Sequence, residues 1–183
     1  MQTNRYGYFR RLVHAAIALF GLGLLGVGMI FYFFGFQGLQ AKLGAETTSM
    51  LYTYHKSFGL VVLVLALLVF FMRKRGGVPP YDPPLAMLLR LPSKLIHWLM
   101  ILALIAMPIL GLIGTIAGGY PVAFFDWSLP QLVSENKALS EQFFHYHMVV
   151  GWVLLGLVAI HLAGAYVHGS IARDTVNSRM SLL

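Results

Sequence analysis

The stretch Phe143–His168, FFHYHMVVGWVLLGLVAIHLAGAYVH, is apolar and long enough to cross a bilayer, and it carries histidines near both ends. Two of these histidines, His147 and His161, lie 14 residues apart. On an α-helix this spacing is ~40° short of four turns and ~21 Å of rise, so both imidazoles project from one face, one in each leaflet. Gly151 and Gly156 leave room beside the backbone between them. The pattern indicates two metal or haem ligands stacked across a membrane.

Composition places the whole chain in a membrane. Of its 183 residues, 58% are hydrophobic and only 10% are charged, whereas a soluble domain carries roughly 25% charged residues. We therefore expect residues 1–183 to form a single integral-membrane domain. The absence of cysteine excludes disulfides, iron–sulfur clusters, thiolate zinc sites and covalently attached c-type haem.

Four apolar segments each have about the ~20 residues that a transmembrane helix needs. Because backbone polar groups in lipid must be satisfied internally, each segment is predicted to be a helix. The predicted fold class is an all-α membrane protein, a bundle of four transmembrane helices with haems between them. The expected spans are approximately 12–34, 50–72, 95–117 and 143–167.

Charge predicts the orientation of the bundle. Ten basic residues lie in the N-terminal segment, the link between spans two and three, and the C-terminal tail: Arg5, Arg10, Arg11, Arg73, Lys74, Arg75, Arg90, Lys94, Arg173 and Arg179. The other two links hold two basic residues, Lys42 and Lys137, beside four acids, Glu46, Asp126, Glu135 and Glu141. By the positive-inside rule, both termini are expected in the cytoplasm of a bacterial inner membrane. The net charge of +7 thus reflects orientation, and we expect no nucleic-acid partner.

The depth of each histidine in its span predicts two pairs. His55 and His147 lie at the outer side and form what we call the outer pair, and His14 and His161 form the inner pair at the cytoplasmic side. Helix bundles build cofactor sites from facing side chains in this way. Histidines in spans also serve helix packing, but the agreement of all four in depth and phase favours ligands.

Each pair suits haem better than zinc. Zinc sites usually take three or four protein ligands, whereas a porphyrin supplies four nitrogens and needs only two axial histidines. Two histidines saturate the iron and leave no site for oxygen, so the centre is expected to carry electrons. Glycines that follow the histidines by whole turns should make room for a flat ring: Gly21, Gly28, Gly59 and Gly151.

Other polar residues near the spans have two readings each. His168 and His97 are candidate contacts to a haem propionate or a quinone carbonyl, or interfacial histidines. Lys56 and Arg11 are further candidate propionate contacts, or else a snorkelling lysine and a topology signal. His145 lies off the His161 face and reads as interfacial, a weaker candidate for the outer ligand.

The sequence resembles the bacterial cytochrome b561 family of small, four-helix, di-haem b proteins of the inner membrane. The resemblance covers nearly the whole chain. It is carried by RRLVHAAIAL around His14, YHKSFG around His55, LIHWLMILALIAMPILGLIG in the third span, and HLAGAYVHGSIARDT after the 14-residue spacing, with His168 and Asp174. The resemblance implies two haem b groups, with His14 and His161 on the inner iron and His55 and His147 on the outer iron.

The resemblance also implies a function. Members of the family move electrons across the membrane to or from quinone, and one branch oxidises superoxide at the periplasmic face and reduces ubiquinone. We therefore expect electrons to pass from a periplasmic donor, superoxide or a redox protein, to ubiquinone. The acidic outer links depart from the superoxide branch, because collecting an anion calls for a positive surface, although Lys56 lies near the outer haem.

Three readings of the function and one assembly remain open at this point. The first is a quinone-reducing oxidoreductase of the superoxide:ubiquinone type, and the second is a haem b membrane anchor subunit of a periplasmic oxidoreductase. A third reading is a transporter or scaffold without haem, whose histidines bind protons or a metal. A homodimer would suit a small bundle with glycine-rich faces.

Overall fold

The computed structural model describes residues 4–81, 84, 87–130, 134–172 and 174–182, so Arg173 of the charge pattern lies outside the described residues. Four helices in these ranges are long and apolar enough to cross a membrane, judged by length and composition. The helices are α1 (Tyr8–Leu43), α2 (Ala45–Gly76), α3 (Met87–Ala117) and α4 (Lys137–Tyr166). A two-stranded sheet, β1 (Val122–Phe124) and β2 (Trp127–Leu129), joins α3 to α4, and η1 (Val167–Ile171) and η2 (Asn177–Arg179) follow α4. The prediction of a four-helix membrane protein is confirmed.

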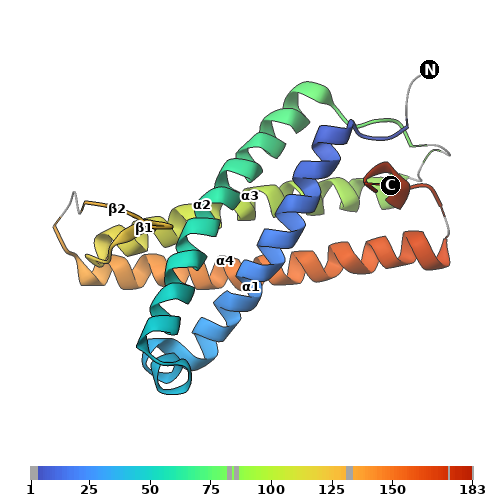
Figure 1. Cartoon of the computed structure of the whole chain (residues 1–183). Coiled ribbons are helices and arrows are strands. Elements are labelled where there is room, and N and C mark those ends of the chain that lie inside the picture. The colour runs from blue at the N-terminus through green and yellow to red at the C-terminus, as the bar shows by residue number, and fades with distance from the viewer. Residues whose placement is uncertain (1–3, 82–83, 85–86, 131–133, 173, 183) are drawn as a thin grey trace.

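The helices form two hairpins that cross each other (Figure 1). Helices α1 and α2 pack together, α3 packs on α4, and α2 also packs on α3. By contrast, α4 has few close backbone contacts with α1 and even fewer with α2. The backbone of the helix with the 14-residue histidine spacing therefore lies farther from α1 and α2 than from α3.

Each predicted span lies within a helix, apart from the last residue of the fourth, which begins η1. The helices are longer than the spans because their polar ends continue beyond the apolar core. In α1 the helix is interrupted at Gly35, whose φ of 61° and ψ of 177° are not helical. A glycine adopts this left-handed φ without the steric cost of a Cβ. Pro92 and Pro108 lie inside α3.

The surface of the bundle is apolar, and the most completely buried side chains among the described residues are small. Leu19 and Val64 are 71% and 65% exposed, as lipid-facing side chains are. The fully buried side chains Thr48 and Ser57 are both small and polar, and Ser140 Oγ donates a 2.8 Å hydrogen bond to the carbonyl of Gly114 across the α3–α4 interface. Small residues and interhelical hydrogen bonds of this kind hold helices together in lipid, where burial of apolar surface drives little association.

The strands β1 and β2 form an antiparallel hairpin that packs on α2. Phe124 pairs with Trp127, so Phe125 and Asp126 make a two-residue turn. Phe125 has a φ of 52°, a left-handed conformation that is unusual for a bulky residue. Its backbone N–H donates to Ser57 Oγ at 2.7 Å, and its ring packs edge-on against Phe58 at a centroid distance of 5.3 Å. These contacts fix the hairpin over the first half of α2, at an end of the bundle that we call the hairpin end.

The other end, which we call the termini end, gathers the N-terminal segment, the α2–α3 link and the C-terminal tail (Figure 1). Arg179 is only 4% exposed and joins all three. Its guanidinium donates to the carbonyls of Pro79 and Asn4, and its carbonyl accepts from the backbone N–H of Tyr6. The three segments that carry most of the basic residues therefore lie close together at one end of the bundle.

Candidate functional site

The four histidines of the sequence analysis meet as two pairs. The ring centroids of His55 and His147 lie 6.3 Å apart, and those of His14 and His161 also lie 6.3 Å apart. Helix α4 supplies one member of each pair, α2 supplies the outer partner and α1 the inner partner. The pairing inferred from depth along the chain is thus the pairing that the fold brings together.

The His147 imidazole is held by the backbone of α3. Its Nδ1 lies 2.8 Å from the carbonyl oxygen of Met107, so Nδ1–H would donate and Nε2 would carry the free lone pair. Gly111, one turn beyond Met107, makes this approach possible, because a Cβ there would lie 3.0 Å from His147 Nδ1. A backbone hydrogen bond that orients the second ring nitrogen is the usual support of a metal-binding histidine.

The His55 imidazole lies in a different environment. Its Nδ1 is buried and has no hydrogen-bond partner among the described residues. The ring packs against Phe31 at 5.1 Å, and a Cβ on Gly28 would lie 3.7 Å from its Cε1. An unpartnered buried nitrogen is costly in a protein interior, and binding a metal at either ring nitrogen would fix the tautomer and offset part of that cost.

The inner pair has a third histidine beside it. The His97 ring lies 5.1 Å from that of His161, and its Nδ1 lies 2.6 Å from the carbonyl oxygen of Ser93. Three imidazoles from α1, α3 and α4 therefore gather at the level of the inner pair, whereas the outer site has two. No group of three or more His, Cys, Asp or Glu side chains in the described ranges has the geometry to hold a metal ion by itself.

The geometry of each pair fits a porphyrin iron with one histidine on each face of the ring. An iron bonded at about 2 Å to one nitrogen of each of two opposed imidazoles holds their ring centroids roughly 6 Å apart. Both pairs have this separation. Helix α4 also makes few close backbone contacts with α1 and α2, the helices that carry the partner histidines. Gly21 and Gly59 leave open space, since a Cβ on either would meet no atom within 4 Å.

Comparison with known proteins shows the family of the chain. A sequence profile of the prokaryotic cytochrome b561 family matches residues 5–181. The chain belongs to the prokaryotic cytochrome b561 family. It is therefore a membrane electron-transfer cytochrome of the type that carries haem b.

Curated relatives of this cytochrome are distant in sequence but similar in length. The chain is 25% identical to cytochrome b561 homolog 2 of Escherichia coli K12, over 97% of this chain and 91% of that protein. It is 24% identical to cytochrome b561 homolog 1 of the same organism, over 93% and 96%. It is 27% identical to a probable superoxide oxidase CybB of Yersinia pestis, over 69% and 72%.

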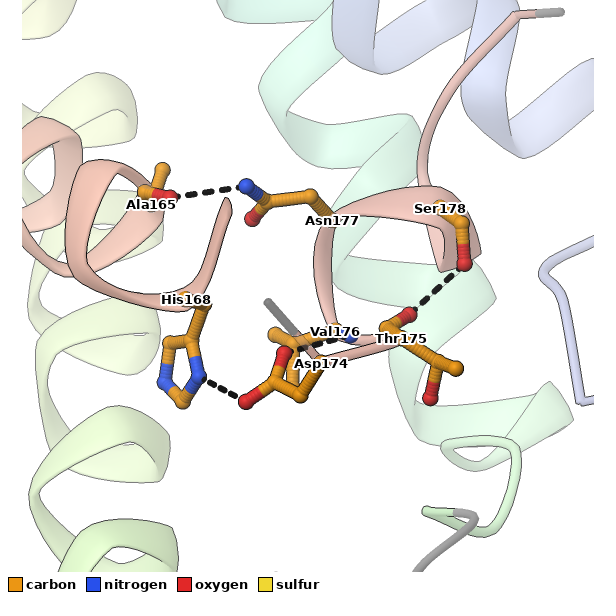
Figure 2. Close-up of polar contacts among 7 residues, drawn as sticks. All are labelled: Ala165, His168, Asp174, Thr175, Val176, Asn177 and Ser178. Atoms are coloured by element: carbon orange, nitrogen blue, oxygen red, sulfur yellow. Dashed lines mark hydrogen bonds and ion pairs between the residues drawn. The ribbon is translucent and has the colours of Figure 1, made fainter. Parts of the chain in front are cut away.

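His168 of this cytochrome lies in an irregular segment after α4 (Figure 2). It belongs to the π-helical turn η1, a form of helix that often occurs at functional sites. Asn177 supports the turn by donating from Nδ2 to the carbonyl of Ala165 at 2.7 Å. His168 Nδ1 lies 2.6 Å from Asp174 Oδ2, so the carboxylate orients the ring and leaves Nε2 available to a ligand.

The Asp174 carboxylate remains charged over the whole neutral range. Burial, the largest single cause, raises its pKa, but the hydrogen bonds from His168 and from the backbone N–H of Val176, together with the charge of His168, lower the pKa more, with a net shift below the ordinary value. The contact with His168 is therefore fully formed above the ordinary carboxyl pKa of about 3.9. It is lost only as the pH falls through the lowered pKa.

Two other candidate residues have backbone partners. Lys56 Nζ donates to the carbonyl of Pro121 at 2.8 Å, which ties α2 to the segment before β1. Arg11 Nη1 donates to the carbonyl of Ser181 at 2.6 Å, while its buried Nε has no partner among the described residues. His145 is exposed, as expected of an interfacial residue, and contacts the ring of Tyr146.

Several supporting residues were not identified from the sequence. Gly111 and the Met107 carbonyl orient His147, and Ser57 holds the hairpin. The i, i+4 spacing of Met107 and Gly111 was visible, but nothing in a single sequence links it to a histidine on another helix.

Substitution of Gly111 by alanine is expected to perturb only the haem that we expect at the outer pair. The added Cβ would force the His147 ring to move by a few tenths of an ångström and would weaken its bond to Met107. Loss of such an orienting contact costs about 10–100-fold in metal affinity. A potentiometric titration that resolves the two haems should show a changed outer midpoint and an unchanged inner one.

Gly23→Ala on α1 is the matched control, because a Cβ there would meet no atom within 4 Å. Equal shifts of both midpoints in Gly111→Ala, or none, would contradict this role for Gly111.

Proposed function

We propose that this cytochrome holds two haem b groups and passes electrons across the membrane from a periplasmic donor to ubiquinone. The observation that carries the proposal is the equal 6.3 Å separation of the ring centroids in both histidine pairs. Haem supplies one-electron redox chemistry, and bis-histidine ligation leaves no site on iron for oxygen. His14 and His161 would hold the inner group, and His55 and His147 the outer one.

We propose superoxide as a donor that fits the chemistry. Two superoxide anions would each give up one electron and leave as dioxygen, while ubiquinone takes two electrons and two protons. The name of the Yersinia pestis relative, a probable superoxide oxidase, supports this reading. With both termini in the cytoplasm, the hairpin end would face the periplasm and meet the donor, and quinone would be reduced near the inner pair.

The first test is a reduced-minus-oxidised optical spectrum of the purified protein with a pyridine haemochrome count. Two low-spin b haems per chain are expected. One haem would refute one of the two pairs, and a colourless protein would refute electron transfer and favour the transporter reading.

A second candidate function is that of a membrane anchor for a periplasmic oxidoreductase. The β-hairpin favours it, because Trp127 at the base of its turn is 81% exposed and the same link carries Asp126 and Glu135. An exposed aromatic side chain among acids suits docking of a basic protein. Turnover with superoxide by the isolated protein would support the first function, and activity only after addition of a co-purified partner would support the second.

We propose that His168 supplies protons to reduced quinone, with Asp174 orienting its ring. Replacing His168 by alanine should slow ubiquinone reduction about 10²–10⁴-fold, the usual contribution of a positioned acid or base. Both haem spectra should remain intact, because His168 belongs to neither pair. Stopped-flow measurement of haem reoxidation by a soluble ubiquinone checks this.

Asp174→Asn is the companion variant. It should retain a partial rate, since the imidazole remains but loses its charged partner. His145→Ala is the matched control, because it removes an exposed histidine near the start of α4, at the opposite end of that helix from His168. Normal reoxidation in His168→Ala would eliminate this role.

A further inference from the structure

A cavity of about 450 Å³ opens at the termini end, between the end of α2 and the start of α3. Its walls combine cations and aromatic rings. The residues that give it this character are Tyr6, Arg73, Tyr81, Arg90, Lys94 and His97. None of the described residues that line it is acidic. The cavity therefore has the charge of an anion site.

The cations of this cavity lack carboxylate partners within the described ranges. The ion pairs found among the described residues are Lys137 with Glu135 and His168 with Asp174, and none of these four residues lines the cavity. Arg73 is half-buried and its guanidinium lies over the ring of Trp98 at 5.1 Å. A partly desolvated cation without a counter-charge is costly, so a bound anion would stabilise this arrangement.

The walls are built rather than incidental. The buried Arg179 fixes them, since its guanidinium stacks on the Tyr81 ring at 3.8 Å, lies 5.5 Å from the Tyr6 ring, and donates to the carbonyl of Pro79. Burial raises the pKa of the Tyr6 phenol more than Arg179 and Arg73 lower it. Tyr6 therefore keeps its O–H at neutral pH and can donate a hydrogen bond to an anion.

An apolar groove of about 410 Å³ adjoins the cavity and shares Tyr6 and Pro79 with it. Its other walls include the side chains of Tyr8, Phe9 and Met72. Arg90 and Lys94 are exposed, so the cavity opens to the outside of the bundle, at the end where lipid headgroups are expected. A charged pocket beside an apolar groove matches a molecule with an anionic head and an acyl chain.

We propose that this cavity and groove bind an anionic phospholipid, with the phosphate among Arg73, Arg90 and Lys94 and an acyl chain along the groove. Basic pockets at the ends of transmembrane helices bind anionic lipids by the same electrostatics. The proposal needs no haem, so it stands or falls separately from the proposed function.

The test is a titration of the delipidated full-length holoprotein in detergent with phosphatidylglycerol or phosphatidylcholine, followed by native mass spectrometry. The expected result is a specific complex with phosphatidylglycerol. The double variant Arg73→Gln with Lys94→Gln should bind phosphatidylglycerol about 30-fold more weakly, because the loss of each cation should lower the affinity somewhat more than fivefold. Lys74→Gln with Arg75→Gln is the matched control, because it removes the same charge from the same basic run outside the cavity, and its affinity should change less than twofold. Arg90→Gln is a milder variant should the first pair fail to fold.

Four results would overturn the proposal. Equal weakening by both double variants would show general surface attraction. Equal binding of phosphatidylcholine would show that the charge of the lipid is not recognised. Equal binding of inorganic phosphate alone would show that the acyl chain is not recognised. A shift of the inner-haem midpoint in lipid-free Arg73→Gln and Lys94→Gln protein would assign these cations to haem propionates instead.

Discussion

Replacing His55 by alanine is expected to halve the haem content of the protein, from two groups per chain to one. His55 is the member of the outer pair contributed by α2, and its ring lies 6.3 Å from that of His147. Among the described residues its buried Nδ1 has no hydrogen-bond partner that would explain its place in the membrane. Pyridine haemochrome analysis of the purified variant measures the loss directly.

The remaining haem should keep the spectrum and midpoint of the inner group. His14→Ala should give the complementary result, loss of the inner group with the outer one retained, unless the nearby His97 replaces the missing ligand. Either single loss should abolish electron transfer across the membrane, since one group alone leaves a gap of about 20 Å along α4.

His145→Ala provides the control for the His55 variant. It removes a histidine near the same end of the bundle that is exposed and belongs to neither pair. It should keep both haems. If the His55 variant also keeps both, the outer pair is wrong.

Replacing Gly118 by alanine is expected to destabilise the fold by about 1–3 kcal/mol, the usual cost of overpacking a close contact. A Cβ at this position would lie 2.6 Å from Ser140 Oγ and 2.5 Å from Tyr120 Cε2. Tyr120 is exposed and can turn away. Ser140 is 4% exposed and bound to the carbonyl of Gly114, so the strain falls on the α3–α4 interface. The temperature of haem release on heating, with a denaturant titration for the free energy, measures the effect.

A double-mutant cycle isolates the contact. In a Ser140→Ala background the hydroxyl is absent, so Gly118→Ala should cost less than in the natural sequence. Gly23→Ala, which meets no atom within 4 Å, should be close to neutral. Purely additive effects of the Gly118 and Ser140 substitutions would show that the helices do not meet closely there.

The helices and both histidine pairs were predictable because they depend on quantities that run along one chain segment. Length and hydropathy define a span, and the 14-residue spacing places His147 and His161 on one face of α4. Depth in the membrane then leaves only one choice of partner from α1 and α2. The structure places these partners at matching distances, and the family comparison agrees with the resemblance that the motifs carry.

The supporting contacts could not be predicted, because they depend on how the helices cross. His97 and His161 were both visible in the sequence, but only the approach of α3 to α4 brings their rings to 5.1 Å. The same approach puts His147 on the Met107 carbonyl over Gly111. Hydropathy is nearly uniform around α4, so it does not specify which face of α4 meets which neighbour.

By itself, the sequence of this protein determined that it spans the membrane, how its charges divide between the two ends, and which histidines share a depth, since these follow from composition and helical periodicity. Only the tertiary structure decided what orients each histidine, how the β-hairpin covers α2, and that Arg179 assembles a basic cavity from three distant segments. The contact of Arg179 with Asn4, for example, joins residues 175 positions apart. They depend on side chains that fit together only after the helices have packed, and no local pattern encodes that fit.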